Sequence, residues 1–200
     1  MNKLLYFLPL YWLFNTNLLA VEPPSNGALI FTEHGSCLVS TYTKSSYSHV
    51  AIILYERGVP IVFEAKPGGT IKSTYAKFQV TATSVKSNGG RQVALWIMEP
   101  KHPYSEAELD AMLDRANAAI GTPYSVIPTL FGRDQNTLQC AQYVSKILEA
   151  GPRFWFRSPK FQTPATLLSI VKPGYEPMAL LKRTTPRTPT IFERVLSITK

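Results

Sequence analysis

Apolar runs in the first half of the chain predict short strands separated by polar segments. Residues 27–31 (GALIF) follow a Pro-Pro-Ser-Asn segment and carry no charge, so we expect a buried strand there. Residues 32–48 are rich in Ser, Thr and Tyr, and we interpret them as a loop. A further apolar run over residues 92–98 predicts another strand.

A β-hairpin is the clearest local pattern in this half. Its two runs, residues 50–55 (VAIILY) and 61–65 (IVFEA), are rich in β-branched side chains and flank a turn at Glu56, Arg57 and Gly58. A Pro-Gly-Gly segment directly after residue 66 ends the second strand.

The second half of the chain has helical spacing. Ser105 and Glu108 form a capping box, in which the hydroxyl accepts from a backbone N–H and the carboxylate reaches back. Apolar residues then recur three and four positions apart until Gly121, which supplies the stop.

A second helix is predicted over residues 138–150, with Asn136 or Thr137 as its N-cap. The order of mostly strands followed by helices predicts an α+β protein with an antiparallel sheet. The apolar face of this second helix consists of Cys140, Val144, Ile147 and Leu148.

Three segments divide the chain. Residues 1–20 have one Lys, then an apolar core, a polar stretch and Ala20, which is the order of a secretory signal peptide. We therefore expect an exported protein, cleaved near Ala20, whose domain spans residues 21–172. Residues 173–200 form a basic, Pro-rich tail, with a short helix predicted over 190–198.

Composition narrows the classes of protein. Hydrophobic residues make up 45% of the chain, which excludes wholesale disorder, and no apolar run reaches the roughly 18 residues of a membrane span. The net charge of +8 comes from scattered Lys and Arg residues. This charge favours peripheral contact with an anionic membrane or wall polymer, whereas no motif for nucleic-acid recognition accompanies it.

His49 and Glu64 are candidates for a catalytic pair because of hairpin geometry. A loop with an even number of residues places them on one face of the sheet, either directly opposite or diagonal, roughly 5 to 8 Å apart at Cβ. A carboxylate so placed would fix the imidazole tautomer and favour its protonated form. The alternative is an edge strand on which Glu64 points into water.

Cys140 falls in the first turn of the second predicted helix. Unpaired N–H groups and the helix dipole stabilise a thiolate there and can receive a developing oxyanion. The alternative is a buried structural cysteine. Since an exported chain meets oxidising conditions, Cys140 is also a candidate for a disulfide with Cys37.

Several segments in order resemble the permuted papain-fold amidases of the NlpC superfamily, the YiiX/YaeF-type cysteine hydrolases. The resemblance runs from about Gly27 to Leu168. The matching segments are residues 27–31 (GALIF), 47–52 (YSHVAI), 62–65 (VFEA), 121–124 (GTPY), 140–144 (CAQYV) and 161–168 (FQTPATLL).

This resemblance implies a papain-like fold in which Cys140 is the nucleophile, His49 the base and Glu64 the orienting group. It also implies an acyl-enzyme mechanism on amides or esters, with wall peptides or acylated lipids as substrates and no cofactor. Tyr124 is a candidate for the substrate site. The chain departs from the family at Ala28, where Asp is usual.

Gln139 is a second departure, since relatives commonly have an aromatic residue there. A zinc site at His34, Cys37 and His49 is a weaker hypothesis. The aromatic segment at residues 154–156 (FWF) would suit an acyl chain, or a role in the core. The rival function is a non-catalytic binding module with Cys140 oxidised to Cys37.

Overall fold

The structure of the protein is a computed structural model. This structure describes residues 23–82, 92–126 and 136–183 of the 200-residue chain. None of the helices within these residues has both the length and the apolar character needed to span a bilayer.

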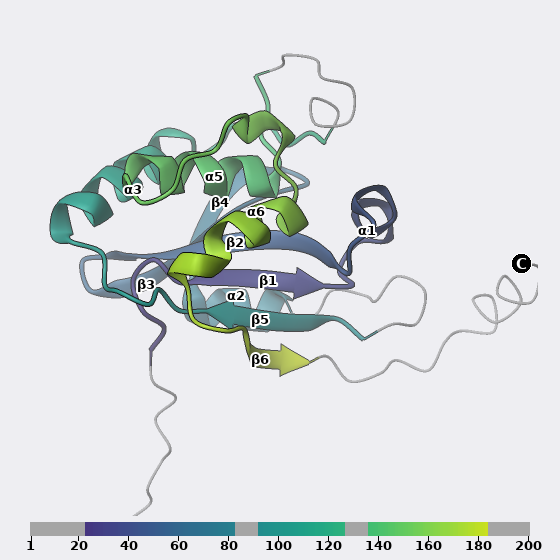
Figure 1. Ribbon diagram of the computed structural model, residues 1–200, viewed down its shortest axis with the longest axis horizontal. Coiled ribbons are helices and arrows are strands. Elements are labelled where there is room, and N and C mark those ends of the chain that lie inside the picture. Colours follow the sequence, from purple (N-terminus) through teal and green to yellow (C-terminus); the bar gives the residue numbers. More distant parts are fainter. Residues whose placement is uncertain (1–22, 83–91, 127–135, 184–200) are drawn as a thin grey trace, which may run out of the picture.

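A six-stranded antiparallel sheet forms the centre of the fold (Figure 1). Its order is β4-β3-β2-β1-β5-β6, and every neighbouring pair is antiparallel. The strands are β1 (Leu29–Glu33), β2 (Tyr47–Glu56), β3 (Val59–Lys66), β4 (Gly69–Thr74), β5 (Ala94–Met98) and β6 (Ala179–Arg183).

The β2–β3 hairpin has the even loop that the sequence predicts. Arg57 and Gly58 have φ angles of 51° and 78°, and two positive φ angles in a two-residue loop define a type I′ turn. Ile52 pairs with Phe63 in the ladder, so Glu64 comes level with Ala51. His49 is therefore the diagonal neighbour of Glu64.

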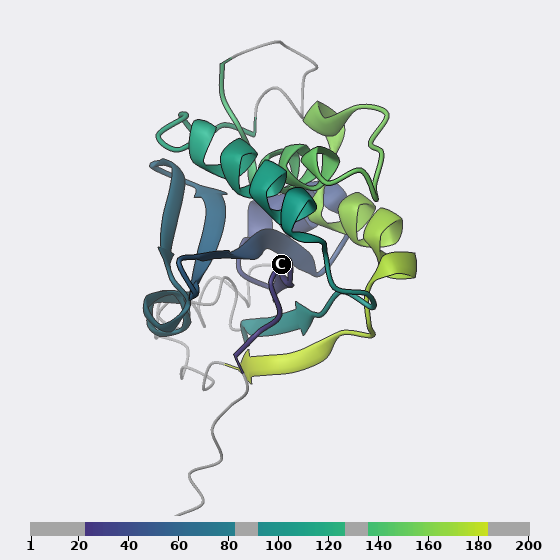
Figure 2. The same ribbon diagram turned by 90° about the vertical axis from the view of Figure 1, so that its left-hand side faces the viewer.

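Helices cover both faces of the sheet. On one face lie α3 (Glu106–Ala118), α5 (Cys140–Ala150) and α6 (Pro164–Val171), which share a core with alternate residues of β1, β2 and β3 (Figures 1 and 2). The other face is covered by α2 (Tyr75–Ala82) through Phe78. Two short 3-10 turns, η2 (Pro159–Phe161) and η3 (Lys172–Gly174), flank α6.

The helices predicted after Pro103 and over residues 138–150 are present, and the capping box of α3 is formed by Ser105 and Glu108 as expected. Residues 32–48, however, are not all loop, because α1 (Cys37–Thr43) forms within them. Its N-cap Ser36 accepts from the Val39 N–H at 3.4 Å, and Lys44 closes it in the left-handed region. Strand β4 and helix α2 were not predicted either.

The sheet extends beyond residue 172, where we expected the domain to end. Strand β6 pairs with β5, so part of the expected tail belongs to the folded domain. The predicted signal peptide and the helix expected over 190–198 lie outside the described residues.

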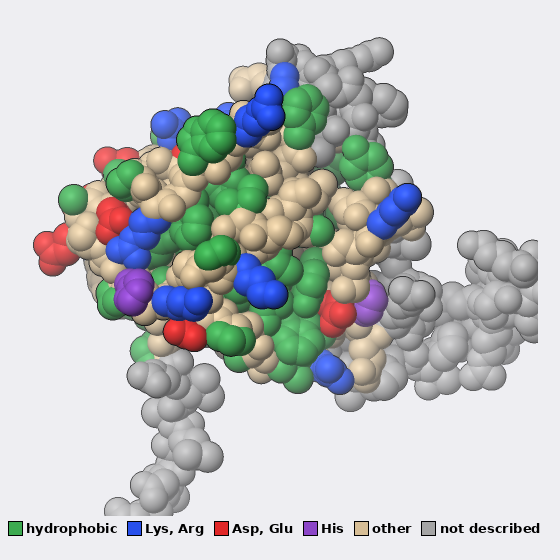
Figure 3. All heavy atoms as spheres, in the orientation of Figure 1, with side chains coloured by type: hydrophobic (Ala, Val, Ile, Leu, Met, Phe, Trp, Pro, Cys, Tyr) green, Lys and Arg blue, Asp and Glu red, His purple; other side chains and the backbone are tan. Residues whose placement is uncertain are grey.

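Charged side chains are dispersed over the surface. In Figure 3, Lys and Arg side chains alternate with acidic and hydrophobic ones and do not gather in one patch on this face. This dispersal matches the scatter of basic residues along the sequence and offers no concentrated positive surface on this side.

Candidate active site

The N-terminus of α5 is capped by Gln139. This corrects the expectation of Asn136 or Thr137, because a backbone bridge between Tyr124 and Leu138 holds the preceding residues in extended conformation. The side-chain oxygen of Gln139 accepts from the Ala141 N–H at 2.8 Å. Helix α5 therefore begins at Cys140 itself.

Cys140 is a buried free thiol at the first position of this helix. Its side chain donates to Oε1 of Gln139, with a sulfur–oxygen distance of 3.5 Å. The Gln139 amide nitrogen in turn donates to the backbone carbonyl of Gln162, just before α6. The residue before the cysteine thus ties α5 to the neighbouring segment.

His49 and Glu64 are hydrogen-bonded across the hairpin. The distance from Nε2 of His49 to Oε2 of Glu64 is 2.9 Å. Glu64 is buried, with 4% of its side chain exposed, and its second oxygen accepts from Nζ of Lys66 at 2.6 Å. The carboxylate inside the apolar run thus has two partners, and it does not point into water.

The charges of this pair support one another. Burial lowers the pKa of His49, but hydrogen bonds and charges from Cys140 and Glu64 outweigh it and raise the pKa to about 10. Burial likewise raises the pKa of Glu64, and the hydrogen bonds and charges of His49 and Lys66 outweigh it and lower the pKa to about 2. Both groups are therefore held in their charged forms at neutral pH.

The structure brings Cys140, His49 and Glu64 together. His49 is hydrogen-bonded to Glu64, and it lies near enough to Cys140 for the thiol to contribute to the raised pKa of the ring. Because Nε2 of the ring is engaged by Glu64, Nδ1 is the nitrogen left for the thiol. Tyr124 lies close by: burial raises the pKa of its hydroxyl, and the charge of Cys140 raises it further.

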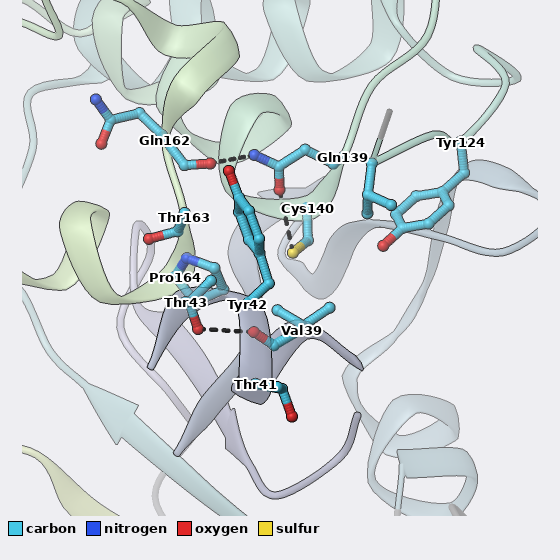
Figure 4. A pocket seen from close by; sticks show the side chains of 11 residues that line it. Val39, Thr41, Tyr42, Thr43, Tyr124, Gln139, Cys140, Gln162, Thr163 and Pro164 are labelled. Atoms are coloured by element: carbon cyan, nitrogen blue, oxygen red, sulfur yellow. Dashed lines mark hydrogen bonds between the residues drawn. The ribbon is translucent and has the colours of Figure 1, made fainter. Parts of the chain in front are cut away.

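Two cavities open beside these residues. One, of about 390 Å³, contains Cys140, and the other, of about 380 Å³, contains His49 and Glu64. Tyr124 and Val39 line both of them. Figure 4 shows the first cavity, in which the sulfur of Cys140 lies between the side chains of Tyr42 and Tyr124.

Other residues of the site were not predicted. Lys66 follows Glu64 by two positions, so strand alternation alone places it on the same face. Val39 and Tyr42 belong to α1, which we expected to be loop. Conversely, the aromatic segment 154–156 does not line the Cys140 cavity: Phe156 is buried in the core, and Phe154 packs against Tyr175.

The weaker zinc hypothesis at His34, Cys37 and His49 stays a prediction, because it includes a side chain outside the described part of the structure. Among the described residues, no three His, Cys, Asp or Glu side chains gather where they could hold a metal ion. His34 lies 3.7 Å from Glu33. Nothing is described of the Cys37 side chain.

Together, the fold and the family comparison define a permuted papain-like α+β protein. The family model for the permuted papain-like amidase enzyme, YaeF/YiiX, C92 family, matches residues 24–162. This match covers more than half of the chain, which therefore belongs to this amidase family. Membership of a family of papain-like amidases supports the conclusion that the protein is a hydrolase.

A solved structure has a similar fold. It is described as the metalloprotein yiiX from Escherichia coli O157:H7, with a TM-score of 0.55 and 16% sequence identity. The similarity covers 83% of this chain and 99% of the other. A comparison with curated proteins gave no match.

Proposed function

We propose that this protein is a cysteine hydrolase that cleaves an amide or ester bond through an acyl-enzyme on Cys140. The observation that carries the proposal is the hydrogen bond between His49 and the buried Glu64, together with the thiol of Cys140, which lies near enough to act on the pKa of the same ring. Each member matches a role: a thiol at a helix N-terminus, an imidazole within its reach, and a carboxylate that orients and charges the ring.

Acylation starts from a thiolate–imidazolium pair, in which the proton of the thiol already lies on Nδ1 of His49. The thiolate then attacks the carbonyl carbon of the substrate, and the carbonyl electrons move onto oxygen. The backbone N–H of Cys140, at the start of α5, has no acceptor within the helix and can stabilise this oxyanion. Collapse expels the amine or alcohol, which leaves with the proton from His49.

Deacylation reverses the roles. A water molecule gives its proton to Nδ1 of His49 and attacks the thioester carbonyl. The carbon–sulfur bond breaks, the acid is released, and the proton stays on His49, which restores the ion pair with the thiolate. Glu64 stays ionised throughout and stabilises the imidazolium, both in the resting ion pair and when it forms again during deacylation.

Location and partners are proposed from the sequence. The signal-like segment at residues 1–20 favours export, and the net charge of +8 favours weak contact with anionic lipid or wall polymer. The substrates we propose are peptidoglycan stem peptides or acylated lipids, which relatives are expected to use.

The nucleophile can be tested by labelling. Iodoacetamide at pH 6 should alkylate Cys140 in the native protein, as read by peptide mass spectrometry, because His49 holds the thiolate as an ion pair. His49→Ala should slow this labelling at least tenfold. A thiol that reacts equally fast in both proteins contradicts the proposed pair.

Catalysis itself is tested with two matched cysteine variants. Cys140→Ala should abolish both hydrolysis and the trapped acyl-enzyme, whereas Cys37→Ala should retain both. The rival binding module predicts that both thiols of the native protein stay blocked until a reductant is added.

A further inference from the structure

The two cavities beside the proposed catalytic pair differ in chemistry. We call them the Cys140 cavity and the His49 cavity, after the reactive residue that lines each. All eleven residues that line the Cys140 cavity are uncharged: Val39, Thr41, Tyr42, Thr43, Tyr124, Val126, Gln139, Cys140, Gln162, Thr163 and Pro164.

The His49 cavity is polar and charged. It is lined by Glu64 and Lys66, which pair at 2.6 Å, by His49, and by the hydroxyl side chains of Ser36 and Ser48 among others. It thus offers charged partners, which the Cys140 cavity lacks.

The proposed reaction assigns one part of the substrate to each cavity. The acyl group becomes bonded to sulfur, so it must lie on the side of Cys140. The leaving group takes its proton from His49, so it must lie on the side of the imidazole. The difference in chemistry between the two cavities therefore indicates a difference in chemistry between the acyl group and the leaving group of the substrate.

Resting on the proposed function, we propose that the substrate carries an uncharged, apolar acyl chain in the Cys140 cavity and a polar leaving group in the His49 cavity. A charged acyl group, such as an acidic or basic residue of a wall peptide, would lose water there without a partner of opposite charge. The structure thus favours an acylated, lipid-like amide or ester over a charged stem peptide.

The size of the Cys140 cavity fits such a chain. A volume of about 390 Å³ lies in the range of small-molecule sites, and apolar atoms of Val39, Tyr42 and Pro164 line it. Each methylene buried there should raise kcat/KM about three- to fourfold, the equivalent of the free energy of its transfer from water.

The test uses esters that share one leaving group. We would measure kcat/KM of the full chain on p-nitrophenyl acetate, pentanoate and octanoate, each rate divided by its hydrolysis in buffer. The p-nitrophenyl monoester of glutaric acid serves as a charged match for the pentanoate. We expect octanoate to exceed acetate at least thirtyfold, and pentanoate to exceed the glutarate at least tenfold.

A matched pair of variants locates the effect. Tyr42→Asp places a charge at the Cys140 cavity and should lower the octanoate-to-acetate ratio at least fivefold. Val59→Asp makes the same kind of change at an exposed hairpin residue that lines neither cavity, and it should leave the ratio unchanged.

The outcomes separate this inference from the proposed function. If no ester is hydrolysed and Cys140 is not acylated, the proposed function fails. If esters are hydrolysed equally well whatever their length, or the glutarate is preferred, this inference alone is overturned. A length preference that Tyr42→Asp leaves intact overturns the assignment of the acyl chain to the Cys140 cavity.

Discussion

Two carboxylates of this protein have the same low pKa and different surroundings. Glu64 and Glu108 are both lowered to about 2, Glu64 by His49 and Lys66 against the effect of burial, and Glu108 first by its hydrogen bond from Arg153. Glu64 is the buried one of the two, and its principal partner is a histidine that also meets a thiol.

Glu108 belongs to a structural cluster. Arg153 donates to both of its oxygens, at 2.7 and 2.8 Å, and also to the backbone carbonyls of His102 and Pro103. The guanidinium lies 4.0 Å from the ring centre of Tyr104. This cluster ties the start of α3 to the segment after α5.

The difference between the two regions shows that a carboxylate with a lowered pKa does not by itself mark a catalytic site. Arginine stays protonated throughout the useful pH range, so the Glu108 cluster can hold charge but cannot move a proton. The imidazole of His49 can do both. What distinguishes the first region is a titratable partner placed between the acid and the thiol that we propose as the nucleophile.

The largest expected effect comes from His49→Ala. Loss of the base and of the proton donor should lower kcat/KM by roughly a thousandfold, within the range for general acid–base catalysis. Steady-state kinetics on the best ester measures it. Retention of more than a tenth of the activity would mean that another group moves the proton.

Glu64→Gln should have a smaller effect. The amide can still accept from His49, but its charge is lost, so the pKa of the imidazole falls and the ion pair weakens. We expect kcat/KM to drop about 10- to 100-fold. This range corresponds to a fall of about one to two units in the pKa of His49, with a factor of ten for each unit. The alkaline limb of the pH–rate profile should also move down from near pH 10, and an unmoved limb would contradict the role of Glu64.

Arg153→Ala should affect stability and leave catalysis intact. Loss of its charge-assisted hydrogen bonds to Glu108 should lower the free energy of unfolding by about 1 to 3 kcal/mol. Urea denaturation measures this change, with kcat/KM of the folded protein as the control. A fall in kcat/KM as large as that of Glu64→Gln would erase the contrast between the two regions.

The smallest effect is a difference in the pH dependence of stability. Both carboxylates have pKa values lowered to about 2, so each contributes stability above pH 4.5 that is lost as the pH falls towards 2. Beside Glu108, the pKa values of Tyr104 and Arg153 are raised from 10.0 and 12.5, so of the two regions it is the Glu64 region that loses stability between neutral pH and pH 10. The pKa of His49 is raised to about 10, so its contribution is complete below pH 6.5 and is lost as the pH rises through 10.

Thermal unfolding between pH 2 and pH 10.5 tests this difference. The alkaline loss should disappear in His49→Ala and persist in Arg153→Ala. An alkaline loss of the same size in both variants would show that it arises from other groups.

The sequence predicted the parts of this site that depend on local geometry. The even turn at Arg57 and Gly58 places His49 and Glu64 on one face, and an acid within an apolar run needs a partner. Both arguments need only the hairpin, and the 2.9 Å hydrogen bond agrees with them. The family resemblance, confirmed by the family match, covers the fold as a whole.

The remaining parts depend on packing between distant segments. Helix α1 forms in a polar stretch without apolar periodicity, because Ser36 caps it locally. The Gln139 side chain that caps α5 is held by a distant residue, because its amide nitrogen donates to the backbone carbonyl of Gln162. The contact of Cys140 with His49 likewise requires α5 to pack on β2, which no local pattern encodes.

The central claim is that His49 is shared between the thiol of Cys140 and the carboxylate of Glu64. Its most direct test is an NMR titration of the His49 ring in the native protein and in Cys140→Ala. We predict a pKa well above 6.5 in the native protein and a clear fall in the variant, because the thiol contributes to the shift. An imidazole that titrates near 6.5 in the native protein, or at the same pH in both proteins, would contradict the account.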